Sequence, residues 1–226
     1  MNIIELTDIS KSYVLGKTKV NALSNIKIEI KKGEFAAIAG PSGSGKTSLL
    51  NIIGLIDKPD TGNYILNGKD TTHIPLNHLA DIRRKTIGFV FQTFNLIPVF
   101  NAFENVEYPM IFTDRSKKEK KDRVDYLLRI VGISELAYHR PFEMSGGQMQ
   151  RIAIARALVN NPEVVLADEP TANLDSKTGA EILEQMKRLN NELNATFIFA
   201  SHDPVVLNAV ERIIYLHDGM IEGGAR

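Results

Sequence analysis

Apolar and polar residues alternate along the first part of the chain in the way that β-strands require. Residues 26–31 alternate isoleucine with charged residues, which is the period of a strand with one buried face. A second strand over residues 34–39 is apolar on both faces, and a glycine-rich stretch separates it from helical spacing over 47–55. A short strand at residues 64–66 lies among Pro, Gly, Asp and Asn. We therefore predict a strand–loop–helix unit beside a small antiparallel β part.

The pattern becomes helical between Gln92 and Ser145, where apolar residues recur at i, i+3, i+4 and i+7 from Val124 onward. After this insertion, strands alternate with helices, which indicates a parallel sheet in an α/β fold. The elements predicted there are a helix over 147–159, a strand over 164–167, a helix over 178–193 and a strand over 196–200. We predict one domain over residues 1–226, with a core of 1–92 and 146–226, which includes the antiparallel part, and a helical subdomain of 93–145.

Composition narrows the class of protein. With 226 residues, 43% hydrophobic and 24% charged, the chain can build its own core and is unlike disordered sequences. Basic and acidic residues both number 27, so the net charge is zero and nothing favours nucleic acid as a partner. Cysteine is absent, which excludes a disulfide scaffold and thiolate metal sites.

Membrane spans and leader sequences have clear signatures, and neither is found. The longest apolar runs are far shorter than the about 20 residues that cross a bilayer. The first ten residues carry two acids and lack the basic and apolar stretches of a secretory leader. We expect a cytoplasmic protein.

The glycine-rich stretch carries the strongest chemical motif. Residues 40–47 follow the phosphate-binding loop pattern, in which glycines let backbone N–H groups converge on phosphate oxygens. Lys46 would reach the β and γ phosphates, Thr47 would offer a hydroxyl to Mg²⁺, and the next helix would point its positive end at the same anion. We expect a nucleotide to be bound by Gly40, Pro41, Ser42, Gly43, Ser44, Gly45, Lys46, Thr47 and Ser48.

Two carboxylates end the strand over residues 164–167, where α/β sheets place their ligands. Asp168 would hold Mg²⁺ through its water shell. Glu169, one residue further, would accept a proton from the water that attacks the γ phosphate.

A second anion site is predicted at Ser145, Gly146, Gly147 and Gln148, because small residues with N–H groups stand there at a helix start. Two phosphate sites so far apart in sequence do not easily serve one γ phosphate within a single fold. A head-to-tail dimer would bring the two together.

The order of these motifs resembles that of ABC-type ATPases, and the resemblance covers nearly the whole chain. It implies a P-loop NTPase with a mixed sheet core, a small antiparallel β subdomain and a helical subdomain. It also implies a homodimer in which each ATP, with Mg²⁺, lies between the phosphate loop of one subunit and the Ser145–Gln148 segment of the other. Hydrolysis of ATP to ADP and phosphate would be tied to closing and opening. The residues that carry the resemblance are 40–47, Gln92, 145–148, 168–169, 173–175 and 201–203.

Four further residues take roles from this resemblance. Tyr13 would stack on adenine, and Gln92 would touch Mg²⁺ or water and relay to a membrane partner. His202 would contact the γ phosphate and help to position water, and Asp175 would lie in the loop that senses the other subunit's site.

The chain departs from the family pattern at two places. Ala172-Asn173 stands where the pair Ser-Ala is usual, and Met144 replaces a common leucine, a swap of similar volume. Neither departure alters a group with an assigned chemical role.

Residues 51–59 and 87–98 resemble one subgroup, the ATPases of lipoprotein release (LolD), macrolide or peptide export (MacB) and cell division (FtsE). This implies a separately encoded permease of the FtsX or MacB type, which would hold the ATPase at the inner face of the membrane. We expect a groove for a cytoplasmic helix of that permease, formed by apolar residues that follow Gln92. These are Phe94, Leu96, Ile97, Val99, Phe100 and Phe103. Packing inside the helical subdomain is the alternative explanation for some of the six.

Three alternatives remain at this point. The first is FtsE-like regulation of cell-wall hydrolysis with no transported cargo. The second is a soluble ABC protein acting on DNA or ribosomes, whose relatives carry long coiled coils or two fused ATPase domains. The third is a small-molecule kinase, which would leave the Ser145–Gln148 segment without a task.

Overall fold

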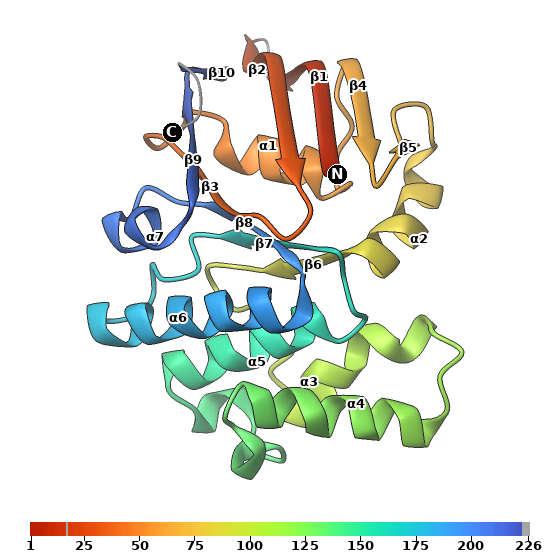
Figure 1. Cartoon of the computed structure of the whole chain (residues 1–226), viewed down its shortest axis with the longest axis vertical. Helices are drawn as coiled ribbons and strands as arrows, with labels where there is room; N and C mark the ends of the chain where they lie inside the picture. The colour runs from red at the N-terminus through yellow and green to blue at the C-terminus, as the bar shows by residue number, and fades with distance from the viewer. Residues whose placement is uncertain (17, 223–226) are drawn as a thin grey trace.

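The computed structural model describes residues 1–16 and 18–222, and it stacks two β-sheets above a layer of helices (Figure 1). Its strands are β1 (Asn2–Leu15), β2 (Thr18–Lys31), β3 (Phe35–Ala39), β4 (Thr61–Leu66), β5 (Lys69–Asp70), β6 (Ile87–Val90), β7 (Val164–Asp168), β8 (Thr196–Ala200), β9 (Arg212–His217) and β10 (Met220–Ile221). Its α-helices are α1 (Lys46–Ile53), α2 (Leu76–Thr86), α3 (Ala102–Glu107), α4 (Lys117–Ile130), α5 (Gly146–Leu158), α6 (Ser176–Leu193) and α7 (Pro204–Ala209). Three 3-10 turns join them, η1 (Tyr108–Phe112), η2 (Ser134–Leu136) and η3 (Pro141–Glu143).

The larger sheet has six strands in the order β10-β9-β3-β8-β7-β6. The five strands from β9 to β6 run parallel, and β10 pairs antiparallel with β9, so the sheet is mixed as predicted. Strands β3 and β8 are buried along their whole length, which explains why they are apolar on both faces. The carboxyl ends of β3, β7 and β8 lie at one edge, so the residues that follow these strands come together.

The smaller sheet is antiparallel, in the order β2-β1-β4-β5, and α1 lies between it and the larger sheet (Figure 1). The sequence predicts the antiparallel part from residues 64–66 but not the 14-residue strand β1 that forms its centre. The pairing of β1 is irregular, with register shifts between Leu6 and Ile9 and between Thr7 and Ser10. Asp8 adopts a φ of +54° inside this irregularity. Such bulges break the two-residue alternation on which strand prediction depends.

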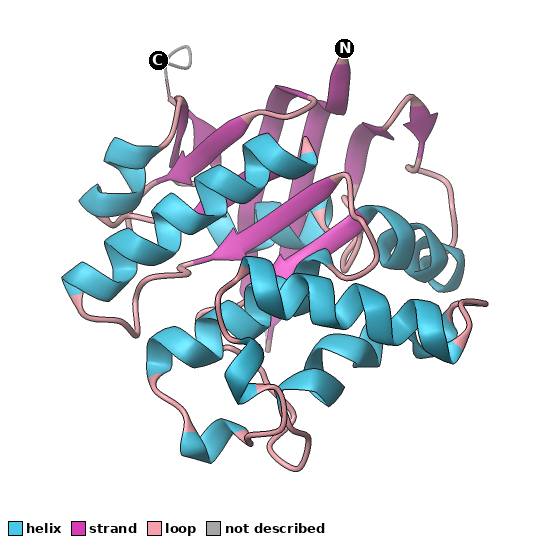
Figure 2. Ribbon diagram, turned by 60° about the horizontal axis from the view of Figure 1, so that its bottom comes forward, coloured by secondary structure: helices cyan, strands magenta, loops and turns pink. Residues whose placement is uncertain are grey.

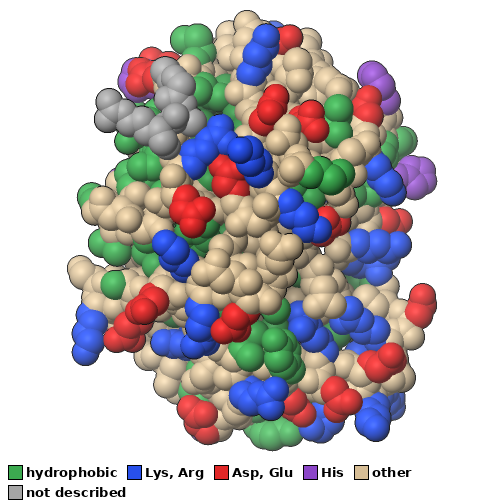
Figure 3. Space-filling view, in the orientation of Figure 1, with side chains coloured by type: hydrophobic (Ala, Val, Ile, Leu, Met, Phe, Trp, Pro, Cys, Tyr) green, Lys and Arg blue, Asp and Glu red, His purple; other side chains and the backbone are tan. Residues whose placement is uncertain are grey.

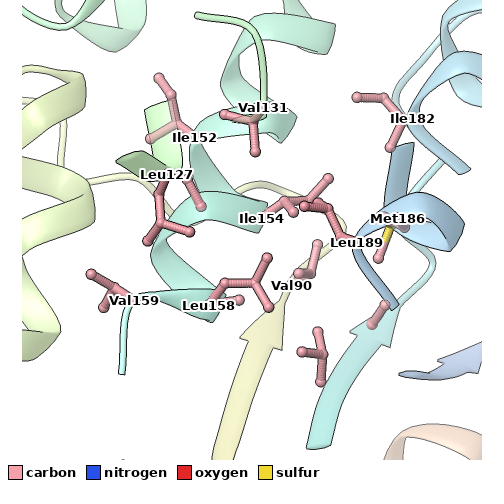
Figure 4. Packing of buried hydrophobic residues seen from close by; sticks show 14 of the residues in the cluster. Val90, Leu127, Val131, Ile152, Ile154, Leu158, Val159, Ile182, Met186 and Leu189 are labelled. Atoms are coloured by element: carbon pink, nitrogen blue, oxygen red, sulfur yellow. The ribbon is translucent and has the colours of Figure 1, made fainter. Parts of the chain in front are cut away.

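Two apolar cores lie on opposite faces of the larger sheet. In the upper core, α1 and the antiparallel sheet pack on residues such as Ile38 and Leu166. In the lower core, the helices pack on residues such as Ala37 and Val165, so successive residues of one strand serve different cores. Figure 4 shows side chains of α4, α5 and α6 converging in the lower core beside Val90.

Residues 93–145 hold α3, α4 and the three 3-10 turns below the sheet (Figure 2). Val124, Leu127 and Leu128 of α4 are buried, as their spacing predicts. We propose that the helical subdomain has its limits at 92/93 and 145/146.

Among the described residues, none of the helices is long and apolar enough to cross a membrane. Figure 3 shows basic and acidic side chains interspersed over one face, which matches the balanced charge.

Candidate active site

The phosphate-binding loop connects β3 to α1 at the carboxyl edge of the larger sheet. Gly43 and Gly45 have φ values of +81° and +104°, which other residues rarely adopt. A Cβ on Gly40 would lie 2.1 Å from the carbonyl oxygen of Leu216, and one on Gly45 would lie 2.5 Å from that of Ala22. Backbone conformation and close packing therefore both require glycine in this loop.

Lys46 and Ser44 supply polar groups inside the loop. Lys46 is 8% exposed, and its Nζ donates to the carbonyl oxygens of Gly40 at 2.7 Å and Pro41 at 3.0 Å. Within the described part of the chain, the buried Ser44 Oγ has no hydrogen-bond partner. An ammonium group and an unpaired hydroxyl beside a helix N-terminus fit a phosphate, which would supply the missing partner.

Three residues that line one hollow carry oxygen atoms suited to Mg²⁺. Thr47 Oγ1 on α1 lies 3.5 Å from Asp168 Oδ2 at the end of β7, and Gln92 follows β6. Burial raises the pKa of Asp168, the charge of Glu169 raises it further, and the Thr47 bond and Lys46 charge oppose both effects. Hydroxyl, carboxylate and amide oxygens are hard ligands, so this set fits Mg²⁺ that is also bound by phosphate.

Glu169 lies next to Ser201 and His202 at the same sheet edge. Its φ of +44° is unusual for a residue other than glycine, and strain of this kind is common at functional sites. Oε1 of Glu169 lies 2.6 Å from Nδ1 of His202, and Oε2 accepts a bond from the Ser201 hydroxyl at 2.7 Å. The sequence placed Ser201 in the 201–203 motif without assigning it a role, and the structure gives it one as a hydrogen-bond donor to Glu169.

A hollow of about 720 Å³ brings many of the predicted site residues together. Predicted residues that line it are Ser42, Gly43, Gly45, Lys46, Thr47, Ser48, Gln92, Asp168, Glu169 and His202. Gly40, Pro41 and Ser44 belong to the same loop without lining the hollow. The rest of the wall, which sequence reasoning missed, is made by Val20, Asn21, Ala22, Ala172, Asp218 and Gly219. Of these, the Asp218-Gly219 dipeptide is a turn signal in the sequence, and Gly219 adopts a φ of +74° in the structure.

The segment Ser145, Gly146, Gly147 and Gln148 does not line this hollow. Ser145 is exposed and caps α5: its Oγ accepts from the backbone N–H of Gln148 at 3.3 Å, and Gln148 Oε1 accepts from the N–H of Ser145 at 2.8 Å. A Cβ on Gly147 would lie 2.6 Å from Thr178 Cγ2. The predicted second anion site is therefore the exposed start of a 13-residue helix, away from the subunit's own phosphate loop.

Asp175 and Tyr13 also lie outside the wall of the hollow. Asp175 caps α6, and its two hydrogen bonds from Thr178 lower the pKa of its carboxyl group. The Tyr13 hydroxyl donates to Asp57 Oδ2 at 2.9 Å, and the Lys11 ammonium lies 5.2 Å from the centre of its ring. Their predicted contacts with the other subunit and with adenine stay predictions.

A second hollow of about 720 Å³ lies between α2, β6 and the helices below them. Its wall is formed by Ala80, Asp81, Arg83, Arg84, Ile87, Gly88, Phe89, Phe91, Pro109, Phe112, Arg156, Ala157 and Asn160. None of the six apolar residues that we expected to form a groove after Gln92 lines it. Leu96 and Phe103 of that set pack against the lower core instead.

The phosphate loop and the carboxylates beside it agree with the protein family that the sequence matches. The family model described as ABC transporter matches residues 23–172. The chain belongs to the ABC transporter family. This confirms the resemblance, and it decides against the small-molecule kinase.

Relatives of this ABC ATPase include proteins of known structure. It is 48% identical over 224 residues to ABC transporter ATP-binding protein MJ0796 of Methanocaldococcus jannaschii, covering 97% of this chain and 95% of that protein. A dimeric structure of a post-hydrolysis state of the MJ0796 cassette, bound to ADP and Pi, has a TM-score of 0.89 at 46% identity, over 99% of this chain and 97% of that one. The predicted fold and the hydrolysis of ATP are confirmed.

A second relative carries a permease in its name. The ABC ATPase is 44% identical over 224 residues to macrolide export ATP-binding/permease protein MacB of Bdellovibrio bacteriovorus. The match covers 99% of this chain but 34% of that protein.

Proposed function

We propose that this ABC ATPase closes as a head-to-tail homodimer around two ATP molecules and drives a separately encoded permease of the FtsX or MacB type at the inner face of the membrane. The task of that permease is export, lipoprotein release or transmission of force. Two relatives support the proposal, since the MJ0796 cassette is dimeric and the name MacB joins an ATP-binding part to a permease.

The observation that carries the proposal is the separation of two anion-binding features within one subunit. Lys46 and Ser44 lie in the phosphate loop, whereas the helix start at Ser145 is exposed and outside the hollow. A second copy can present its own Ser145 and Gly147 to the exposed side of the bound ATP. Each γ phosphate would then be held from both sides, which explains why the chain carries both motifs.

The chemistry assigns a separate role to each polar side chain. Lys46 would neutralise charge on the β and γ phosphates, and Thr47, Gln92 and Asp168 would hold Mg²⁺. Bound Mg²⁺ supplies positive charge to the phosphate oxygens. Glu169 orients the attacking water and accepts its proton, so the carboxylate becomes a carboxylic acid as the water oxygen bonds to the γ phosphorus. The bond from that phosphorus to the β–γ bridging oxygen breaks, and ADP leaves with the bonding electron pair. Ser201 and His202 fix that carboxylate from two directions.

The second hollow is the site that we assign to the permease. Phe89, Phe91 and Phe112 offer apolar surface there, and Phe112 is 67% exposed. Arg83 and Arg84 add positive charge to the same wall. A short amphipathic helix with apolar and acidic residues, from a cytoplasmic loop of the permease, fits this combination.

The dimer is tested with the Glu169→Gln variant. We expect it to bind ATP and to accumulate as a dimer in sedimentation analysis at saturating Mg-ATP, because the water loses its base while both phosphate sites persist. Lys46→Ala is the matched control, and it should lose ATP binding itself because the phosphates lose their main charge partner. A Glu169→Gln protein that binds Mg-ATP but stays monomeric would contradict the dimer.

The permease site is tested by crosslinking in cells that co-express a candidate permease with four membrane helices and a large extracytoplasmic domain. A photoreactive residue at Phe112 should reach the permease, whereas one at Lys187, on the exposed side of α6, should not. A photoreactive residue at Phe100 tests whether the apolar residues after Gln92 also contact the permease: crosslinks from position 100 would support the groove predicted there. Equal labelling from positions 112 and 187 would argue against the assignment.

A further inference from the structure

The Gln92 loop, which we define as residues 92–95, has an unusual backbone. Phe94 and Asn95 have φ values of +60° and +49°, and both lie in the left-handed region. This region is unfavourable for a residue with a side chain and above all for a bulky one such as Phe94. Two successive residues of this kind persist where neighbouring groups hold them.

Arg156 of α5 holds the far end of the loop. Its Nη2 donates to the carbonyl oxygen of Phe94 at 2.6 Å, and its Nη1 donates to that of Asn95. Burial lowers the pKa of Arg156 to about 10. Among the described residues, no carboxylate forms an ion pair with this guanidinium. This half-buried cation is satisfied by the two loop carbonyls, which fit the fork of an arginine.

Asn173 holds the near end of the loop. Its Nδ2 donates to the carbonyl oxygen of Gln92 at 2.8 Å. Asn173 stands at one of the positions where the chain departs from the usual family pair, and the fold gives this departure a partner. Its side chain is exposed, so folding does not require it.

We propose that Asn173 and Arg156 are positioning residues that together hold the Gln92 loop, so that the Gln92 side chain faces the metal ligands Thr47 and Asp168. The proposal rests on the proposed role of Gln92. The two contacts come from different elements. Asn173 lies two residues before Asp175, and Arg156 lies on the helix that begins after Ser145. A shift of either element would therefore move the loop through its backbone carbonyls.

Steady-state hydrolysis by the purified ATPase tests this proposal. We expect Asn173→Ala and Arg156→Lys each to lower kcat about 3- to 10-fold, the loss typical of one hydrogen bond, and to leave KM for ATP within about twofold. Arg156→Lys keeps the charge but loses the fork that reaches two carbonyls. The Kd for Mg²⁺, titrated by calorimetry into protein saturated with a non-hydrolysable ATP analogue, should rise in both variants together with the Mg²⁺ concentration for half-maximal rate. Asn191→Ala, at an exposed asparagine of α6, is the matched control and should behave as the wild type.

A double-mutant cycle with Gln92→Ala shows whether the two residues act through Gln92. Once that side chain is gone, Asn173→Ala should lower kcat little further, because the loop has nothing left to position. Additive losses would overturn the proposal, and so would wild-type kcat and Mg²⁺ dependence in both single variants. Because Asn173 is exposed, its variants decide the matter if Arg156→Lys unfolds.

This result is separable from the test of the dimer. If Gln92→Ala alone keeps the wild-type rate and Mg²⁺ dependence, the role of Gln92 is wrong and this proposal fails with it. ATP-dependent dimerisation of Glu169→Gln is unaffected by that outcome.

Discussion

The Glu169 carboxylate and the His202 ring are in direct contact, with Oε1 2.6 Å from Nδ1. Ser201 occupies the other carboxylate oxygen, so both oxygens of the proposed base have a protein partner. The contact also uses one of the two ring nitrogens of His202. Nε2 is then the ring nitrogen that remains free of Glu169. It can donate to a γ phosphate, and so link the base to the phosphate, when both ring nitrogens carry a proton.

Replacing His202 with Ala should therefore slow hydrolysis more than it weakens ATP binding. We expect kcat to fall about 100-fold or more, in the range found for positioned acid–base groups, with a much smaller change in Kd for ATP. His78→Ala, at an exposed position of α2, is the control and should keep the wild-type rate. A His202→Ala protein with wild-type kcat would show that Glu169 does not need this contact.

Replacing Asp168 with Asn should stabilise the nucleotide-free protein. Burial and the Glu169 charge raise the pKa of Asp168, so the folded state disfavours its ionised form. Because the pKa of Asp168 is raised on folding, its protonated form favours the folded state. That contribution to the free energy of unfolding is complete below the ordinary pKa of 3.8 and is lost as the pH rises through the pKa of the folded protein. Ionised Asp168 therefore costs stability at neutral pH, and the substitution removes that cost.

The expected rise in Tm at pH 7 is small, about 2–4 °C at most, because the carboxylate is partly exposed and solvent screens it. Asp175→Asn is the matched control and should give no gain, because the pKa of Asp175 is lowered. Hydrolysis with Mg²⁺ should fall in the Asp168 variant. A Tm at pH 7 equal to or below that of the wild type would contradict this account of the charge.

The phosphate loop predicts a graded series of glycine variants. Gly45→Ala meets both an unfavourable φ and the Ala22 carbonyl oxygen at 2.5 Å. Gly43→Ala meets no atom of the described residues within 4 Å and bears the φ of +81° alone. We expect Gly45→Ala to cost about 1–3 kcal/mol in the free energy of unfolding and to abolish nucleotide binding. Gly43→Ala should cost about 1 kcal/mol.

Gly16→Ala provides the control for φ alone. Gly16 has a φ of +63°, and among residues 1–16 and 18–222 no atom would lie within 4 Å of its added Cβ; it also does not line the hollow. It should lose a similar amount of stability to Gly43→Ala and keep the wild-type Kd for ATP. Urea unfolding and nucleotide titration measure both quantities. Equal effects of the Gly43 and Gly45 substitutions would show that the approach of Ala22 does not matter.

The chemistry of the site could be predicted from the sequence because it lies in short segments directly after strands. Residues 40–47, 168–169 and His202 each follow an apolar strand, and parallel strands bring their carboxyl ends to one edge. Local sequence patterns and one general rule of α/β sheets were therefore enough to predict these site residues, without knowledge of how the core packs.

The remaining wall of the hollow depends on long-range pairing that leaves no local pattern. Gly219 donates its N–H to the carbonyl oxygen of Ser44 and accepts from the N–H of Ser24, which brings the turn after β9 to the middle of the phosphate loop. The helix α2 was also missed, because its apolar face is narrow: Leu79 is its buried residue, and Ile82 is partly buried beside the upper core. Tertiary contacts therefore place both the Gly219 turn at the first hollow and α2 at the second.

The Ser145→Asp variant can separate the cap of α5 from the proposed contact with the partner's ATP. Aspartate caps helices as well as serine does, so α5 and the thermal stability of the monomer should be kept. Its carboxylate would, however, place negative charge beside the γ phosphate of the partner's ATP and repel it. In the Glu169→Gln background, we expect ATP-dependent dimerisation to be lost while each subunit still binds ATP. Ser145→Ala, which loses the cap at a cost of about 1 kcal/mol, should weaken the dimer less. If the Asp variant dimerises in sedimentation analysis as readily as Glu169→Gln alone, Ser145 does not face a phosphate and the head-to-tail arrangement is wrong.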